Sequence, residues 1–212
     1  PATFHPVAPA AASAANAAVA AATNSAPLFK FSVDATWRIP VGDGDESDSV
    51  DALCLWQPGR ALRVRLSSFG ITGGEILYDG DTWFFADDLE GRVYRTRRID
   101  LLRVGNIPPA FFRELYLLPT YGWLASPPDS VEKSDDGAVW RFTWHANGVT
   151  RQALASPGDP LPVTLEISSD SGVSLSAVFS RPSTNMTPTA ATFAPRYDRY
   201  ELIDLDARGR NR

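Results

Sequence analysis

Apolar and polar residues alternate in short runs over most of the chain that follows Lys30. In one run, Phe31, Val33, Ala35 and Trp37 are separated by neighbours that are mostly more polar. Alternation with a period of two indicates strands that bury one face, and clusters of Gly, Pro, Asp and Asn between the runs indicate turns. We count about ten runs, which is more strands than a flat sheet usually keeps without curling. The pattern predicts one strongly curved antiparallel sheet.

Several of the turns carry the residues of tight hairpins. Gln57–Gly59, Asp79–Asp81, Ala146–Gly148 and Ser169–Gly172 each separate two alternating runs. Asp-Gly and Asn-Gly pairs are typical of such turns because they accept the positive backbone angles required there. The spacing is that of a β-meander, in which consecutive strands are neighbours in the sheet.

One segment departs from the strand pattern and predicts a helix over Pro109–Leu118. Proline suits the first turn of a helix, and Phe111, Leu115 and Leu118 then fall at positions i, i+4 and i+7. An aromatic loop, Tyr121–Leu124, follows. We expect this segment to be a lid over the sheet or a plug that completes the core. The candidate lid residues are Phe111, Phe112, Leu115, Tyr116, Leu118, Tyr121 and Trp123.

The fold class that follows is mainly β: an incomplete β-barrel of about ten strands with a helical lid or plug. Residues 1–29 contain no charged side chain and many alanines, which leaves two alternatives. The segment is a flexible tether, which we favour because termini are often disordered, or a helix over Ala10–Thr23, because alanine is the best helix former. We therefore divide the chain into this segment, a sheet domain over 30–207 and a polar tail over 208–212.

Composition excludes several function classes. Lys and Arg total 20 and Asp and Glu total 25, so the net charge of −5 creates no positive field for nucleic acid. Only His145 lies in the predicted sheet domain among the two histidines, and the single Cys54 permits neither a disulfide nor a thiolate pair. Asp87, Asp88 and Glu90 share a turn, where adjacent carboxylates are usually only solvated. We expect no enzyme, no cofactor and no metal.

The abundance of aromatic residues points to binding instead. The chain has 6 Trp, 6 Tyr and 11 Phe, and a curved sheet can direct a set of them to its concave side. Such a set forms either an apolar ligand cavity or an ordinary filled core, and residue by residue the core is the commoner outcome. A single sheet with one helix, however, has little else to fill its concavity. The candidate cavity residues are Trp37, Trp56, Trp83, Phe85, Trp140, Phe142 and Trp144.

Charged clusters give two weaker candidates. The acidic stretch Asp43–Asp51 suggests a calcium loop, but Asp48 stands where an EF-hand needs glycine, so we favour a solvated hairpin loop. A group of arginines suggests a basic patch for anionic headgroups or an acidic partner, but solvation of a strand face is the reading we favour. These arginines are Arg60, Arg63, Arg65, Arg92, Arg95, Arg97 and Arg98.

Three stretches resemble the LolA/LolB-like superfamily of bacterial envelope proteins, whose members shuttle or receive lipoproteins. Leu55–Val64 is similar to a strand, proline-containing turn and basic-aromatic strand of that family, and Leu77–Phe85 is similar to its Asp-Gly hairpin and aromatic strand. Phe193–Leu205 is similar to its closing strand. The resemblance implies an unclosed antiparallel half-barrel with a helical lid and a hydrophobic cavity that holds acyl chains.

The leading hypothesis is a non-enzymatic binding protein of the bacterial envelope, in the periplasm or anchored to the outer membrane and facing the periplasm. Its partner would be a lipid acyl chain or a lipoprotein, with contact to a membrane surface as a further option and no role for nucleic acid. The alternative is a structural or protein-interaction domain of the envelope with a filled core. A hydrolase built on His145 is a distant third, because no triad partners accompany that residue.

Overall fold

The computed structural model describes residues 2–68, 71–102, 126–156 and 158–208. The predicted lid helix, its aromatic loop and the last four residues of the predicted polar tail lie outside the described residues. The strands are β1 (Phe4–Pro6), β2 (Phe29–Val41), β3 (Gly44–Gln57), β4 (Ala61–Ser68), β5 (Ile71–Tyr78), β6 (Trp83–Asp87), β7 (Arg92–Thr96), β8 (Ser130–Ser134), β9 (Trp140–Ala146), β10 (Val149–Ala155), β11 (Thr164–Ser169), β12 (Ser174–Phe179) and β13 (Glu201–Asp204). The helices are α1 (Pro9–Thr23), the 3-10 helix η1 (Ile99–Leu101) and α3 (Leu205–Arg208).

All thirteen strands belong to one sheet, in the order β1-β8-β9-β10-β11-β12-β2-β3-β4-β5-β6-β7-β13. The outermost strands β1 and β13 do not pair with each other, so the sheet is open. The predicted mainly β class and single open sheet are confirmed, although the strands outnumber the ten expected. Two meanders, β2–β7 and β8–β12, account for most of the pairings, and they join where β12 lies beside β2.

The predicted hairpin turns are present. Gln57 pairs with Ala61 across the β3–β4 turn, and Tyr78 pairs with Trp83 across the β5–β6 turn. In the latter turn, the Asp79 carboxylate accepts hydrogen bonds from the backbone N–H groups of Asp81 and Thr82. These turns set the register of the ladders, and therefore which side chains share a face.

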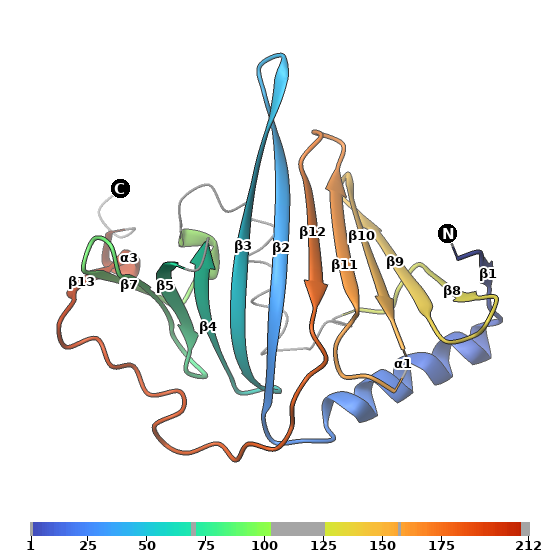
Figure 1. Ribbon diagram of the computed structural model, residues 1–212, viewed down its shortest axis with the longest axis horizontal. Helices are drawn as coiled ribbons and strands as arrows, with labels where there is room; N and C mark the ends of the chain where they lie inside the picture. The colour runs from blue at the N-terminus through green and yellow to red at the C-terminus, as the bar shows by residue number, and fades with distance from the viewer. Residues whose placement is uncertain (1, 69–70, 103–125, 157, 209–212) are drawn as a thin grey trace.

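The acidic stretch is a strand and not the solvated loop that we expected. β2 and β3 pair from Phe29 opposite Trp56 to Val41 opposite Gly44, so a two-residue turn at Gly42 and Asp43 is all that connects them. Gly42 has a φ of 59°, which suits glycine at this tight turn. The carboxylates project into solvent from a hairpin that stands above its neighbours (Figure 1).

The N-terminal segment forms structure, whereas we favoured a flexible tether. β1 pairs with β8, and α1 places Ala15 and Val19 in the core formed with the sheet. The apolar environment explains the outcome, because burial stabilises an alanine-rich helix that would be marginal alone in water. Among the described helices, none is both long enough and apolar enough to cross a membrane.

The last strand, β13, runs parallel to its neighbour, whereas we expected an antiparallel sheet. Residues 182–200 cross the sheet before β13 begins, so the chain reaches β7 at the end where that strand starts, and β13 pairs with it in parallel. The segment is held on the way: Arg63 donates to the Ala194 carbonyl (2.9 Å), and the Tyr197 hydroxyl donates to Glu75 (2.9 Å). We call residues 182–200 the strap.

Gly74 in β5 provides a test of how closely β5 and β6 pack. A Cβ atom at Gly74 would lie 2.5 Å from the Ala86 carbonyl oxygen and 2.8 Å from the Phe85 ring. We expect Gly74→Ala to lower the free energy of unfolding by about 1–3 kcal/mol, because overpacking forces neighbours to shift. Urea unfolding measures the change.

The adjacent Gly73 is the control, because a Cβ atom there meets nothing within 4 Å. Gly73→Ala should stay within about 0.5 kcal/mol of the wild type. Equal effects of the two substitutions would contradict the close packing at Gly74.

Candidate functional site

All seven candidate cavity residues lie on one face of the sheet. Across the ladders, Trp56 pairs with Leu62, Leu62 with Tyr78 and Tyr78 with Trp83, and directly paired residues share a face. Register partners also connect β2 to β9 through β12, β11 and β10, and they place Trp144 on the same face as Trp37. We call this side the aromatic face; its predicted members are Trp37, Trp56, Trp83, Phe85, Trp140, Phe142 and Trp144.

The aromatic face is buried. Trp56 and Phe142 are fully enclosed, Trp37 and Trp144 are also buried, and Trp140 is half-buried. Neighbouring rings are in contact: the Phe29 and Trp56 centroids are 5.3 Å apart. Ring pairs at such distances contribute to stability beyond their apolar area. The face is therefore a continuous apolar layer and not an open trough.

Helix α1 contributes to the cover of this layer through small side chains. Ala15 and Val19 belong to the buried core, with Ala12 packed against it. Asn16 lies on the same side of the helix, and its carboxamide oxygen is buried without a hydrogen-bond partner. A helix over Ala10–Thr23 was the less favoured alternative from the sequence, because termini are often disordered unless something holds them in place.

Cys54 lies within the aromatic face. It is 1% exposed, between Phe31 on β2 and Val64 on β4 in the register. Burial raises the pKa of the Cys54 thiol well above its ordinary value, because a thiolate would lose its hydration there. The thiol is therefore a small apolar core group and not a nucleophile.

The remaining polar candidates have structural partners. Asp87 accepts hydrogen bonds from the backbone N–H groups of Leu89 and Glu90, which orders the β6–β7 turn. His145 is exposed, and its Nδ1 lies 3.1 Å from the Thr150 hydroxyl. Neither arrangement resembles the acid–base pairing of a hydrolase.

Most of the candidate basic patch is paired with carboxylates. Arg95 bonds to Asp204 (2.6 Å) and Arg98 to Asp100 (2.7 Å). The other ion pairs in the set are Arg63 and Arg65 with Glu75, Arg92 with Glu90 and Glu201, and Arg97 with Asp81. These pairs reduce the positive field that an anionic surface would meet.

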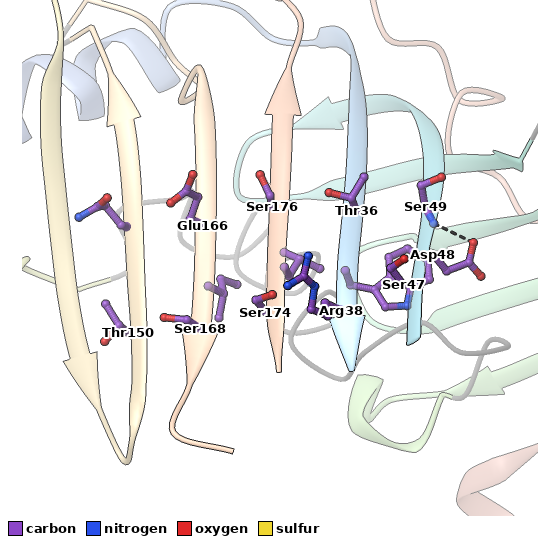
Figure 2. A pocket seen from close by; sticks show the side chains of 14 residues that line it. Thr36, Arg38, Ser47, Asp48, Ser49, Thr150, Glu166, Ser168, Ser174 and Ser176 are labelled. Carbon is purple, nitrogen blue, oxygen red and sulfur yellow. Dashed lines mark hydrogen bonds between the residues drawn. The ribbon is translucent and has the colours of Figure 1, made fainter. Parts of the chain in front are cut away.

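A polar groove occupies the opposite face (Figure 2). It has a volume of about 710 Å³ and crosses β10, β11, β12, β2 and β3. Its lining includes Thr36, Arg38, Glu166, Ser174 and Ser176, which alternate with residues of the aromatic face. Sequence reasoning treated these positions as ordinary solvent-facing strand residues and did not identify the groove.

Comparison with known proteins identifies the architecture. A LolA superfamily protein from Nitrosomonas europaea matches with a TM-score of 0.52 and 12% identity, over 86% of this chain and 98% of that one. An uncharacterized conserved protein from Thermus thermophilus matches with a TM-score of 0.55 and 13% identity, over 92% of this chain and 99% of that one. No family model and no curated protein sequence matches. The chain has a LolA-like fold, which confirms the resemblance at the level of architecture.

Asn16 generates a stability prediction. We expect Asn16→Ala to raise the free energy of unfolding by about 1–2 kcal/mol, because it removes a buried acceptor without a partner. Urea unfolding of the wild type and the variant measures the difference. Ser13→Ala, at an exposed position of α1, corrects for the helix preference of alanine.

Asn24, the residue that caps α1 at its C-terminal end, is expected to have the opposite effect. Asn24 donates from its side chain to the Ala20 carbonyl (2.8 Å) at the helix end, so Asn24→Ala should destabilise. A loss of stability in Asn16→Ala would show that its oxygen is satisfied in the folded protein.

Cys54 generates a reactivity prediction. At about pH 8, we expect a thiol-specific reagent to modify it at least about 100-fold more slowly in the native protein than in denaturant, because both burial and the raised pKa suppress the thiolate. A Ser13→Cys variant that also carries Cys54→Ser is the accessible control. Comparable rates for native and denatured Cys54 would mean that the aromatic face is open to solvent.

Proposed function

We propose that this chain, with its LolA-like fold, is a non-enzymatic carrier or receptor for an acyl chain or a lipidated polypeptide segment, working in the bacterial periplasm or anchored to the outer membrane on its periplasmic side. One observation carries the proposal. Aromatic residues from both halves of the sheet lie on a single face, and the described helix that packs there contributes mainly methyl groups. Such a layer offers an acyl chain an apolar surface once the cover moves.

The free energy of such binding would come from burial. Each methylene removed from water contributes about 0.8 kcal/mol. Association itself costs about 4–15 kcal/mol, so only a long chain would be held firmly. This arithmetic favours ligands with long acyl chains over short ones, and it requires no charged contact.

Helix α1 is well suited to give way to a ligand. Only Ala15 and Val19 are buried in the core, so displacing this helix exposes little apolar area of its own. The unpartnered oxygen of Asn16 further weakens the packing of α1 against the sheet. An acyl chain could therefore replace the contacts of α1 at low cost. The predicted lid residues on the segment 109–124 stay a prediction.

The rim of the aromatic face at β8–β10 has the character of a headgroup site. The Arg151 guanidinium lies 4.4 Å from the Trp144 ring centroid, and the Lys133 ammonium lies 5.7 Å from that of Trp140. Cations held over aromatic rings at an apolar rim favour an amphipathic ligand, with its chain inside and a polar or anionic group outside. This arrangement supports a lipid over a wholly apolar molecule.

Displacement of a fluorescent hydrophobic dye tests the proposal. Palmitate, lysophosphatidylcholine and a triacylated lipopeptide serve as competitors. We expect Phe85→Ala to weaken competition by about tenfold, since a buried ring on the aromatic face is lost. A folded protein that no acylated competitor displaces from dye would favour the alternative, an interaction domain with a filled core.

Phe84→Ala is the matched control. Phe84 precedes Phe85 on β6 and therefore points to the other face, where its ring centroid lies 5.8 Å from that of Tyr197. Its loss removes a similar ring without changing the aromatic face, so competition should be unchanged in the folded variant. Equal loss in the two variants would mean that the dye reports stability and not the proposed site.

A further inference from the structure

The polar groove is a second concave surface, separate from the aromatic face. Its volume of about 710 Å³ lies within the range of small-molecule sites, which is about 300–1,000 Å³. It is formed on the interior strands of the sheet, where the side chains have fixed cross-strand neighbours. Its lining is therefore held in place by the ladders and not by loops.

The side chains in the groove form two rows across the strands (Figure 2). Glu166, Ser176 and Thr36 are register partners in one row, and Ser168, Ser174 and Arg38 in the next. Directly opposed residues have Cβ atoms about 4.5–5.5 Å apart. The rows thus present polar groups at regular intervals across neighbouring strands.

The chemistry of the rows selects a hydroxyl-rich ligand. Each Ser or Thr hydroxyl can both donate and accept a hydrogen bond, as can every hydroxyl of a sugar. Glu166 adds an acceptor and Arg38 adds donors, so both partners of a sugar hydroxyl are represented. In the described structure, none of the hydroxyls of Ser168, Ser174, Ser176 and Thr36 is tied to another protein group.

Other ligand classes fit less well. An acyl chain would find hydroxyls and charges where it needs apolar side chains. Phosphate would meet Arg38, which already pairs with Asp45 at 3.5 Å, in a groove whose lining also includes the carboxylate of Glu166. An added peptide strand needs an open sheet edge, but β12 is paired on both sides here.

We propose that the polar groove binds a neutral oligosaccharide, lying across β11, β12 and β2, with its hydroxyls bonded to the two rows. Trp37 contributes to the groove lining but belongs to the aromatic face, so neither row presents an aromatic ring on which a sugar could stack. Binding is therefore expected to be weak, with a Kd of about 1 mM, and to depend on hydrogen bonds. The proposal does not depend on lipid binding at the aromatic face.

Titration of the isotope-labelled protein with chitotetraose and maltotetraose, followed by NMR, tests this assignment. We expect saturable shifts of backbone resonances in β11, β12 and β2 for at least one of the two sugars. Ser176→Leu, which places an apolar side chain in the middle of a row, should weaken binding by at least about tenfold. Glu166→Gln tests the row without adding bulk, and a smaller loss is expected because the amide keeps an acceptor oxygen.

Thr164→Val is the matched control, since Thr164 lies on the same face of β11 but outside the groove lining. Binding by this variant and by Phe85→Ala should equal that of the wild type. The proposal is overturned if neither sugar gives saturable shifts, if Ser176→Leu and Thr164→Val bind alike, or if inorganic phosphate or a Ser-Gly peptide shifts the same resonances more strongly than the sugars do.

Discussion

A sheet that directs its tryptophans to one side needs a cover for that side, and this requirement governs the whole molecule. From β9 at one flank to β6 at the other, the ladders keep Phe142, Trp56 and Trp83 in phase. A slip of one residue in any ladder would move some of these aromatic side chains to the solvent-facing side of the sheet. The tight turns prevent such slips, so hairpin geometry and burial of the aromatic face depend on each other.

The face opposite to the aromatic face differs between the two halves of the sheet. Over β5 and β6 the opposite face also carries buried apolar residues, Leu77 and Ala86, and the strap packs on that face through Tyr197. Over β10–β3 polar side chains line the groove on that face, and Leu53 and Val178 beside them are exposed. The strap therefore covers the part of this face that carries buried apolar residues, and the groove lies on the part that does not.

The sequence was sufficient for those features that depend on local patterns. Alternation identified the strands, and Asp-Gly and Asn-Gly pairs located the hairpins, so the aromatic face followed from parity alone. Contacts between distant segments could not be predicted from the sequence. The burial of Val19 in α1 and the parallel pairing of Glu201 with Arg92 depend on the finished sheet. The acidic stretch was misread because its charges suggested a loop, whereas the opposing strand from Trp37 to Val41 supplies a backbone partner for it. The groove was missed because single polar positions give no signal until their neighbours across the ladder are known.

The join between β12 and β2 has a consequence for how the chain folds. Trp37 and Leu175 are register partners although most of the chain separates them, while the two meanders on either side are built from contacts close in sequence. Closing so long a loop carries an entropic cost that local hairpins avoid, so this seam should form late and limit the folding rate. Until then, β2 and β12 are open edges able to recruit other chains. Asp34 and Arg38 place opposite charges along that temporary edge of β2, a common protection against aggregation in strands that stay at an edge permanently.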